Sequence, residues 1–490
     1  MGYFAAINQP IKTMKKILMF ALVASVALFT ACKDDEETFN APSVATPDPS
    51  SAEFNAEVEL TFNYTTDAGY KSASVSATNG TATIKTGGTV GSASGTVVVT
   101  FVAGDQAGAG SVELSITDNA DQTSKATAVI SVLEEQIIFN VDGNITANTT
   151  WETGKVYVLK SRISVVSGVT LTIEPGVVVK GEAGTGANAT ALIIARGAQI
   201  KAEGTAEKPI IFTSIADEIM PGQVASPNLD PTLNGLWGGL LVLGNAPISA
   251  SAASVQIEGI PPSDQNGLYG GSDANDNSGV IKFISIRHGG ANIGEGNEIN
   301  GLTLGGVGAG TIIENVEIVS NQDDGIEWFG GTVNVKNAVI WNTGDDAVDT
   351  DQSWGGTLDN FIVINPGDEC FELDGPEGAM AAKHTIKNGT VYAMDADGLV
   401  DNDANSYVDM MNVYFRDLKT GQDFDQLPVD YACTFSSLEA TIPDGAAVAD
   451  FFKDGSEAFV TAVAAGASTV GADLSKFEGW SWAHVSGSLK

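Results

Sequence analysis

Five segments in the middle of the chain share an asparagine followed by apolar residues, and they recur at nearly regular intervals. The asparagines are Asn315, Asn337, Asn360, Asn388 and Asn412, separated by 22, 23, 28 and 24 residues. A second column advances by the same steps, at Asp324-Gly325-Ile326, Asp346-Ala347-Val348, Glu369-Cys370-Phe371 and Asp397-Gly398-Leu399. Two columns in step, with periods of about 20–25 residues and β-type segments, are typical of a solenoid.

Each coil of such a solenoid lays down short strands that pair with the coils above and below, about 4.8 Å away. We expect Ile326, Val348, Phe371 and Leu399 to stack inside the coil. The asparagines are expected to form a ladder of side-chain amides at one turn, each bonded to the next. Because no 3.6-residue periodicity appears inside the unit, a helical or leucine-rich repeat is disfavoured. The sequence therefore predicts an all-β parallel β-helix.

Earlier segments carry the same pattern in a degraded form, at 165–181, 191–197, 208–213 and 236–240. They resemble the opening coils of right-handed parallel β-helix lipoproteins of the Bacteroidota, and the resemblance covers residues 137–435. It implies a fold of the pectate-lyase-like superfamily. Members of that superfamily include polysaccharide lyases, hydrolases and adhesins, so the resemblance predicts a fold and a habitat rather than one activity.

The N-terminal segment predicts export and lipid anchoring. Two lysines are followed by a 13-residue apolar stretch at 17–29, which is too short to span a membrane. The residues ending at Cys32 resemble a bacterial lipobox, which implies cleavage before Cys32 and acylation of that cysteine. We therefore expect translation to start at Met14, residues 1–31 to contain the signal peptide, and residues 32–50 to form a lipidated tether.

The acidic run that follows, Lys33-Asp34-Asp35-Glu36-Glu37, resembles the export tag of surface-exposed Bacteroidota lipoproteins. It predicts a protein held in the outer membrane by its lipid and displayed on the cell surface. A solvated spacer without a sorting role is the alternative.

Residues 51–135 are expected to form a small immunoglobulin-like β-sandwich that acts as a spacer. Its strands are indicated by alternating or β-branched stretches at 58–64, 72–77, 96–102, 112–116 and 126–132. The segment contains no histidine and no pattern that predicts chemistry. Weak glycan binding is the alternative role.

The last segment, 436–490, changes character and is expected to cap the final coil of the β-helix, since a solenoid needs its open end covered. Its stretches 446–452 and 456–465 have helical spacing. Cys370 and Cys433 are expected to be unpaired core thiols, with a disulfide between them as the alternative.

The charge of the chain narrows the choice of partners. Lys and Arg number 24 and Asp and Glu number 61, which gives a net charge of −37. So many uncompensated carboxylates would repel a phosphate backbone or an anionic lipid surface. Nucleic acid is therefore excluded as a partner, whereas divalent cations and neutral or cationic ligands stay open.

Carboxylates recur at the turns of the repeat, where stacked coils would bring like charges about 5 Å apart. Clusters rich in oxygen are what Ca²⁺ selects. The predicted metal ligands are Asp323, Asp324, Asp345, Asp346, Asp368 and Glu369. Two alternatives stay open: the aspartates accept hydrogen bonds within Asx-turns, or the carboxylates are catalytic.

Ligand-binding residues are predicted on the same coils. They are Glu327, Asp349, Glu372 and Trp354. Trp354 lies beside two glycines and is expected to be an exposed platform for a sugar ring, whereas Trp328 is expected to face the core. The only basic groups that could reach this face are Arg287-His288, Lys383-His384 and Arg416.

These residues favour a binding protein over an enzyme, because the companion motifs of β-helix pectate lyases and polygalacturonases are missing. The sequence thus predicts non-catalytic binding of a glycan or another cell-surface polymer, assisted by Ca²⁺. A polysaccharide lyase or glycoside hydrolase is the first alternative, and a structural or adhesion protein is the second.

Overall fold

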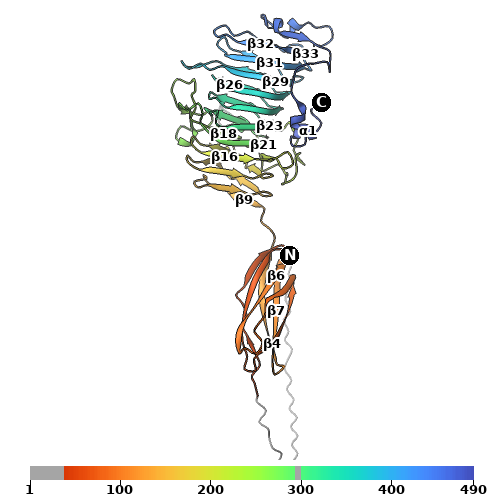
Figure 1. The fold of residues 1–490 in the computed structure, drawn as a ribbon. Helices are drawn as coiled ribbons and strands as arrows, with labels where there is room; N and C mark the ends of the chain where they lie inside the picture. The colour runs from red at the N-terminus through yellow and green to blue at the C-terminus, as the bar shows by residue number, and fades with distance from the viewer. Residues whose placement is uncertain (1–37, 293–298, 490) are drawn as a thin grey trace, which may run out of the picture. The chain divides into compact units, whose positions relative to one another are not determined.

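The computed structural model describes residues 38–292 and 299–489, and the chain divides into two compact units, 1–135 and 136–490 (Figure 1). The predicted signal peptide, Cys32 and the acidic run 33–37 lie outside the described residues. In the described part of the chain, no helix combines the length and the apolar character needed to cross a membrane.

The first unit consists of two four-stranded sheets, ordered β1-β3-β6-β5 and β2-β8-β7-β4. Every strand pair except β2–β8 is antiparallel. Alternation along the strands directs apolar side chains inward, so Phe62, Phe101 and Ile116 are fully buried. The strands are β1 (Ser43–Val44), β2 (Ser50–Glu53), β3 (Glu57–Thr65), β4 (Tyr70–Thr78), β5 (Gly80–Thr86), β6 (Ser94–Ala103), β7 (Gly108–Asp118) and β8 (Thr123–Leu133).

The second unit is a parallel β-helix with two long sheets, which confirms the predicted fold class (Figure 1). The large sheet follows the path β9-β11-β14-β17-β21-β23-β25-β27-β29-β31-β33-β34, with β10, β13, β16 and β32 beside it. The small sheet is ordered β12-β15-β18-β22-β24-β26-β28-β30. Strands in successive coils pair in parallel, so each residue type that recurs in the repeat forms a column.

The large sheet contains β9 (Ile138–Val141), β10 (Thr149–Trp151), β11 (Val156–Leu159), β13 (Thr170–Ile173), β14 (Val178–Gly181), β16 (Gln199–Glu203), β17 (Ile210–Ser214), β21 (Gly279–Arg287), β23 (Ile312–Val319), β25 (Asn334–Trp341), β27 (Thr357–Ile364), β29 (His384–Tyr392), β31 (Val408–Arg416), β32 (Thr434–Ser436), β33 (Leu438–Ala440) and β34 (Val460–Ala462). The small sheet contains β12 (Arg162–Val165), β15 (Ala191–Ile194), β18 (Leu240–Leu243), β22 (Leu302–Gly305), β24 (Ile326–Phe329), β26 (Val348–Gln352), β28 (Phe371–Leu373) and β30 (Asp401–Asn402). A short hairpin, β19 (Val255–Gln256) and β20 (Leu268–Tyr269), lies in the insertion between β18 and β21.

Five strands of the large sheet carry the predicted asparagine in mid-strand. Each has a φ between +57° and +60°, the left-handed region that asparagine tolerates better than most residues. Asn337 Nδ2 donates to Asn315 Oδ1 (2.8 Å), and Asn360 Nδ2 donates to Asn337 Oδ1 (2.8 Å). Asn412 Nδ2 donates to Asn388 Oδ1 (3.0 Å). The amide ladder therefore exists along most of its expected length.

The ladder is interrupted between Asn360 and Asn388. Asn388 Nδ2 donates instead to Asp359 Oδ1 (2.7 Å), and Asn360 Oδ1 accepts a hydrogen bond from the Asp473 backbone N–H (2.6 Å). The C-terminal segment thus provides the partner that the next coil does not.

All four predicted inward residues are fully buried in the core, but the strand register differs from the prediction at the fourth, Leu399. Ile326 pairs with Val348 and Val348 with Phe371, and all three are fully buried. Val400 continues the column instead of Leu399, because β28 and β30 pair with a step of 29 residues where the asparagines advance by 28. The turn before β30 therefore holds one more residue than the asparagine spacing indicates.

The C-terminal segment, 436–489, packs against the β-helix in two places: at the end of its core and on the outer side of the large sheet. Phe451 and Phe452 join the main core beyond the last full coil, between η3 (Val448–Asp450) and η4 (Ser456–Phe459). These short 3-10 turns replace the longer helices that the spacing favoured. The helix α1 (Trp482–Val485) lies on the outer side of the large sheet (Figure 1). Residues of η5 (Leu474–Phe477) pack there as well, and Trp482 contacts Trp341 edge to face.

Candidate functional site

A column of carboxylates crosses the outer side of the small sheet. Strand pairing places Glu327 beside Asp349, Asp349 beside Glu372, and Glu372 beside Asp401. The neighbouring residue Ile326 belongs to the core, so strand alternation directs these carboxylates outward. Parallel pairing separates consecutive members by about 4.8 Å.

A second column of carboxylates lies in the turns that lead into these strands. Asp324 Oδ1 accepts a hydrogen bond from the Asp346 backbone N–H (3.0 Å), and Asp346 Oδ1 accepts one from the Glu369 backbone N–H (2.7 Å). These bonds join consecutive coils, whereas an Asx-turn would bond within a single turn. The two columns together are named the acidic face, which consists of Asp324, Glu327, Asp346, Asp349, Glu369, Glu372 and Asp401.

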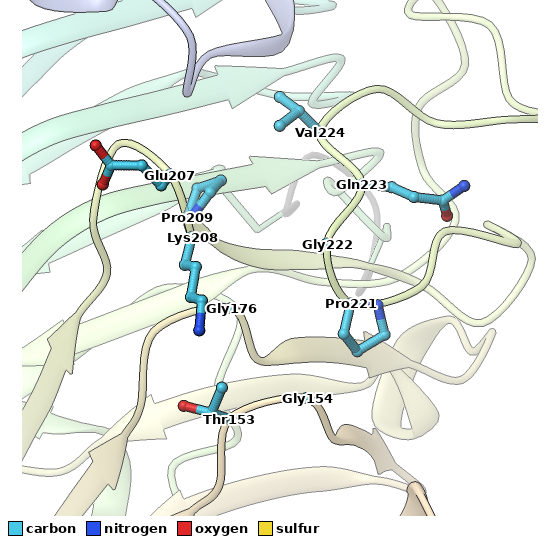
Figure 2. A pocket seen from close by; sticks show the side chains of 10 residues that line it. All are labelled: Thr153, Gly154, Gly176, Glu207, Lys208, Pro209, Pro221, Gly222, Gln223 and Val224. Carbon is cyan, nitrogen blue, oxygen red and sulfur yellow. The ribbon is translucent and has the colours of Figure 1, made fainter.

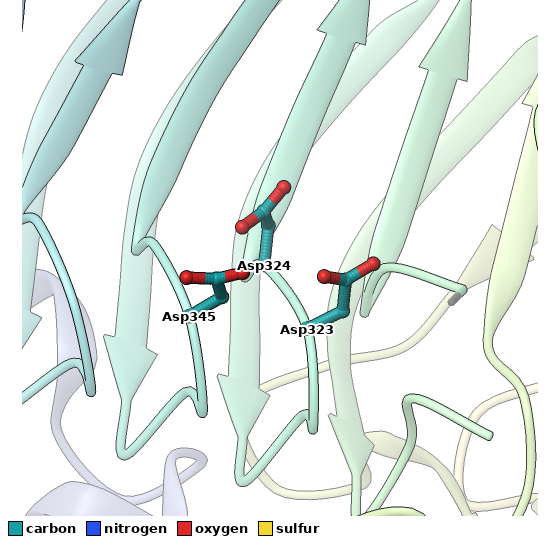
Figure 3. A group of neighbouring side chains, drawn as sticks. All are labelled: Asp323, Asp324 and Asp345. Carbon is teal, nitrogen blue, oxygen red and sulfur yellow. The ribbon is translucent and has the colours of Figure 1, made fainter. Parts of the chain in front are cut away.

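Two groups of three carboxylates converge closely enough to hold a metal ion. One group is Asp323, Asp324 and Asp345, whose side chains lie on neighbouring turns (Figure 3). The other is Asp324, Glu327 and Asp349, all of them buried. Within each group one oxygen from each residue lies within 4.8 Å of the others. This buried acidic cluster could therefore hold a cation.

The remaining predicted metal ligands take other partners. Asp368 forms a hydrogen bond with Glu369, and Glu369 forms another with Asp346. Within the described ranges, these three residues belong to neither of the two convergent groups. The predicted ligand set is thus brought together only around Asp324.

Carboxyl groups lie close together at the centre of the acidic face. Burial raises the pKa of Asp324 well above its ordinary value, and the neighbouring carboxylates of Asp349, Asp323 and Asp345 raise it further. No basic residue is among the groups that act on it. A cation bound here would offset this repulsion.

Hydrogen bonds between carboxyl groups also constrain the protonation state of the acidic face. Glu327 bonds to Asp349, and burial is the main cause that raises the pKa of both. Asp346 bonds in the same way to Glu372, and burial again is the main cause of its raised pKa. A bond between two carboxyl oxygens needs a proton on one of them. At neutral pH these pairs must therefore keep a proton or exchange it for another cation.

Three further carboxyls titrate near neutrality. Burial, followed by the charge of Glu377, raises the pKa of Asp351 to about 7. Burial, followed by Asp403, raises that of Asp374 to about 7. Burial and the hydrogen bond with Asp368 raise that of Glu369 to about 7. The charge of this surface consequently changes over the physiological pH range.

Trp354 is fully buried, so the prediction of an exposed sugar platform is wrong. Its ring stacks between Trp328 (4.6 Å between centroids) and His384 (5.4 Å), and its Nε1 donates to Val333 O (2.9 Å). A Cβ at Gly356 would lie 1.9 Å from Val333 O, so the glycine next to this corner serves close packing. Trp328 faces the core, as predicted.

The basic residues that the sequence placed within reach of the acidic face are held elsewhere. Arg287, at the end of β21, is buried with its Nη2 3.7 Å from Glu317. Lys383 pairs with Asp409 (2.5 Å), and Arg416 ends β31 of the large sheet. Arg287 and Lys383 are therefore engaged in ion pairs, and Arg416 belongs to the large sheet, whereas the acidic face lies on the small sheet.

Hollows open at several places on the described surface of the second unit. One, of about 200 Å³, lies at turns of the early coils and is lined by Thr153, Gly176, Lys208, Pro209 and Pro221 among others (Figure 2). It contains none of the predicted site residues.

Another hollow, of about 380 Å³, adjoins the acidic face. It is named the carboxylate pocket, and its polar lining is Ser251, Gln256, Glu258, Tyr269, Asp351, Gln352 and Glu377. Sequence reasoning missed this pocket. Glu258 and Glu377 come from insertions that do not follow the repeat, whereas Asp351 lies two residues beyond Asp349 on β26 and could have been found by strand alternation.

The stacked coils and the acidic face define a parallel β-helix protein with a buried carboxylate cluster suited to a cation. Residues 143–442, more than half of the chain, match the pectate-lyase-like β-helix domain, and the chain belongs to this family.

A solved structure, a family 28 exopolygalacturonase from Yersinia enterocolitica, is 11% identical over 86% of this chain and 90% of that chain, with a TM-score of 0.20. A similarity this weak carries no argument about function. No curated protein matches the sequence significantly.

Proposed function

We propose that the protein binds a polysaccharide, or another cell-surface polymer, along the acidic face and does not cleave it. A Ca²⁺ ion held by Asp324, Glu327 and Asp349 assists this binding. The proposal depends chiefly on the convergence of these three buried carboxylates within 4.8 Å. Asp349 Oδ1 accepts no hydrogen bond and is available as a ligand atom. Ca²⁺ prefers six to eight oxygen ligands, so oxygens of a polymer would complete its shell.

Two further observations support a binding role. The family to which the chain belongs is built on a pectate-lyase-like β-helix, a scaffold whose long sheet offers a track for an extended chain. Two of the basic residues that the sequence offered as a base, Arg287 and Lys383, are paired with Glu317 and Asp409. A lyase would need such a group free beside the sugar.

A glycoside hydrolase is the second candidate, favoured by one observation. Asp351 and Asp374 each have a pKa of about 7, which suits a carboxyl that donates a proton at neutral pH. A hydrolase pairs such an acid with an ionised carboxylate nearby. An assay for reducing ends, run on the glycans that bind, separates this candidate from the first. A hydrolase releases reducing ends, whereas a binding protein does not.

We propose in addition that Cys32 carries a lipid and that the protein is displayed on the outer membrane of a Bacteroidota-like bacterium. This proposal depends on the apolar stretch at 17–29, the lipobox-like residues up to Cys32 and the acidic run 33–37.

A glycan array probed with the full-length protein, with and without Ca²⁺, tests the main proposal. Bound glycans are then measured by calorimetry with the double variant Asp324→Asn, Asp346→Asn. A matched control is Asp142→Asn, Asp444→Asn, which removes the same charge from two exposed positions outside the acidic face. We expect the first variant to lose at least tenfold in affinity and the second to behave as wild type.

Assays for reducing ends and for unsaturated uronates, which absorb near 235 nm, accompany the array. Turnover of a bound glycan would replace the binding function with an enzymatic one. Absence of binding to every glycan would leave a structural or adhesion role. Binding that is indifferent to both Ca²⁺ and the acidic-face variant would contradict the proposed site.

A further inference from the structure

The carboxylate pocket brings together three segments that are distant in sequence. Asp351 and Gln352 lie at the end of β26, Glu258 lies in the insertion between β18 and β21, and Glu377 lies in the insertion after β28. Tyr269 closes the pocket from β20. Because Asp351 follows Asp349 on the same strand, the pocket is continuous with the acidic face.

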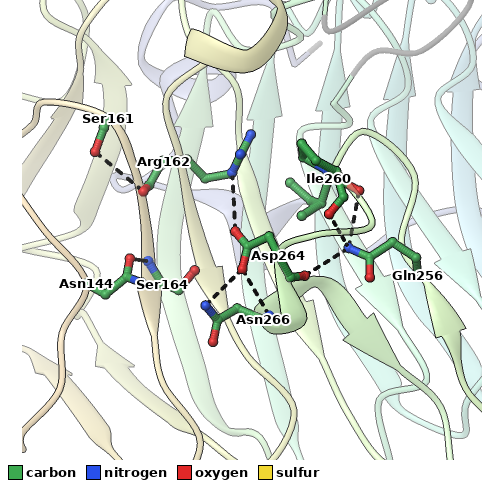
Figure 4. Close-up of polar contacts among 9 residues, drawn as sticks. Asn144, Ser161, Arg162, Ser164, Gln256, Ile260, Asp264 and Asn266 are labelled. Atoms are coloured by element: carbon green, nitrogen blue, oxygen red, sulfur yellow. Dashed lines mark hydrogen bonds and ion pairs between the residues drawn. The ribbon is translucent and has the colours of Figure 1, made fainter.

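The loop that carries Glu258 is fixed by its own hydrogen bonds (Figure 4). Gln256 Nε2 donates to the carbonyl oxygens of Ile260 (3.2 Å), Pro261 (3.3 Å) and Asp264 (3.2 Å). Asp264 in turn accepts from the Asn266 backbone N–H (3.1 Å). The pocket wall is therefore formed before a ligand arrives, which lowers the entropic cost of binding.

Gln352 supplies an acceptor that the protein leaves without a partner. Its side chain is 97% buried, since the residue is only 3% exposed. Its Nε2 donates to Tyr269 Oη (3.0 Å) and to Glu377 Oε2 (3.1 Å), which fixes the direction of the amide. Its Oε1 accepts no hydrogen bond. A buried acceptor without a hydrogen bond lowers the stability of the folded protein, so a ligand that donates a hydrogen bond to Gln352 Oε1 is favoured.

The charge of the pocket points to a cationic ligand. Burial raises the pKa of Asp351, and the carboxylates of Glu377, Glu258 and Glu372 raise it further, with no basic group among the causes. The pocket lining contains three carboxylates and no basic residue, and Arg196 nearby is held by Ser254 Oγ and Gly270 O, to which its Nη1 donates (2.7 Å each).

The geometry favours an organic cation over a metal ion. In the described ranges only two groups of acidic residues have oxygens that all lie within 4.8 Å of one another, and neither group includes Glu258, Asp351 or Glu377. The three carboxylates therefore surround a space instead of converging on a point. A volume of about 380 Å³ accommodates a whole sugar ring, far more than an ion needs.

We propose that the carboxylate pocket binds the protonated amine of an amino-sugar unit, with Gln352 Oε1 accepting a hydrogen bond from the same unit. The inference deepens the proposed function and depends on it, since the amino sugar is a unit of the polysaccharide on the acidic face. It identifies the polymer as a cationic one, in keeping with a protein whose net charge is −37.

Calorimetry with the full-length protein tests the inference. The ligands are an oligomer of β-1,4-linked glucosamine, the same oligomer fully N-acetylated, and a lysine oligomer of equal charge, all at an ionic strength of about 0.15 M to screen long-range attraction. The variants are Glu377→Gln, whose side chain is exposed and tolerates replacement, and Asp351→Asn. Asp444→Asn is the charge-matched control outside the pocket.

We expect the glucosamine oligomer to bind at least tenfold more tightly than its acetylated form, and each pocket variant to lose about tenfold while the control loses little. Because Asp351→Asn also removes a buried like charge, it should raise the melting temperature without ligand, which shows that the variant is folded.

Three results would overturn the inference. Equal affinity for the free and acetylated oligomers would show that the amine is not recognised, and the proposed polysaccharide binding would still stand. Equal affinity for the lysine oligomer would indicate a basic peptide as the ligand. Binding of neutral or acidic glycans alone would refute the amine subsite, whereas a glycan array without any binding would refute the proposed function itself.

Discussion

Raising the pH from 6 to 8 should destabilise the second unit when no divalent cation is present. A carboxyl whose pKa is raised by folding stabilises the protein below its unfolded pKa, and that stability is lost as the pH rises through its folded pKa. Asp351 has a folded pKa of about 7, against about 3.9 in an unfolded chain. Between pH 6 and 8 it alone should lower the free energy of unfolding by about 1.4 kcal/mol.

The proton shared by Glu327 and Asp349 acts in the same direction. Burial raises the pKa of both carboxyls, so the folded protein holds that proton more tightly than the unfolded chain, and this contribution to stability also falls as the pH rises. His384 opposes this, because burial lowers its pKa to about 3 and its contribution rises by about 0.8 kcal/mol over the same range. Burial lowers the pKa of His288 as well, with the same sign. Asp374 and Glu369, each with a pKa of about 7, act in the same direction as Asp351, so the net change from pH 6 to pH 8 is a loss of stability and a lower melting temperature.

Tryptophan fluorescence is the appropriate measurement, because all seven tryptophans lie between residues 151 and 482 and therefore report on the second unit alone. Ca²⁺ should raise the melting temperature more at pH 8 than at pH 6, since a cation that displaces protons binds better where protons are scarce. NaCl at matched ionic strength should do much less. A melting temperature that is unchanged or higher at pH 8 without Ca²⁺ would refute the account of shared protons. Equal effects of Ca²⁺ and NaCl would refute the cation site.

Three further predictions concern the fold and the anchor. Val348→Asp should lower the free energy of unfolding by several kcal/mol, because it buries an unpaired charge in the coil, whereas Thr350→Ser should be mild; equal melting curves would refute the inward column. Asn337→Ala should cost about 2 kcal/mol in denaturant unfolding by removing two ladder bonds, and a loss below 0.5 kcal/mol would contradict the ladder. Cys32→Ala should abolish labelling by palmitate, and equal labelling would exclude acylation at Cys32.

The repeat made much of the second unit predictable because parallel stacking converts a sequence period into a spatial column. Once Asn315 and Asn337 are aligned, the same step aligns Glu327 with Asp349, which is why the acidic face could be drawn from the sequence. The alignment failed at Leu399, where the turn before β30 has a length of its own. An extra residue in a turn shifts the register of the small-sheet strand of that coil, while the large-sheet strand keeps the register that the asparagines predict.

Trp354 shows where reasoning by composition is weakest. In the sequence, an aromatic residue beside two glycines is equally compatible with an exposed sugar platform and with a tightly packed, buried corner. The structure shows a tight corner. Gly356 has no Cβ, so the chain can pass close to Val333. The indole of Trp354 is packed between Trp328 and His384. Such packing depends on contacts between coils that a single sequence does not reveal.

The two parts of the candidate site differ in how the sequence encodes them, and this difference has a functional consequence. The cation cluster at Asp324, Glu327 and Asp349 consists of repeat residues whose positions are set by the stacked sheets. The carboxylate pocket takes Glu258 and Glu377 from insertions, which tolerate change in length and sequence more readily than strands do. If the cluster supplies a general affinity for polymer oxygens and the pocket selects one sugar unit, exchange of the insertions should alter the choice of ligand without loss of the Ca²⁺ response.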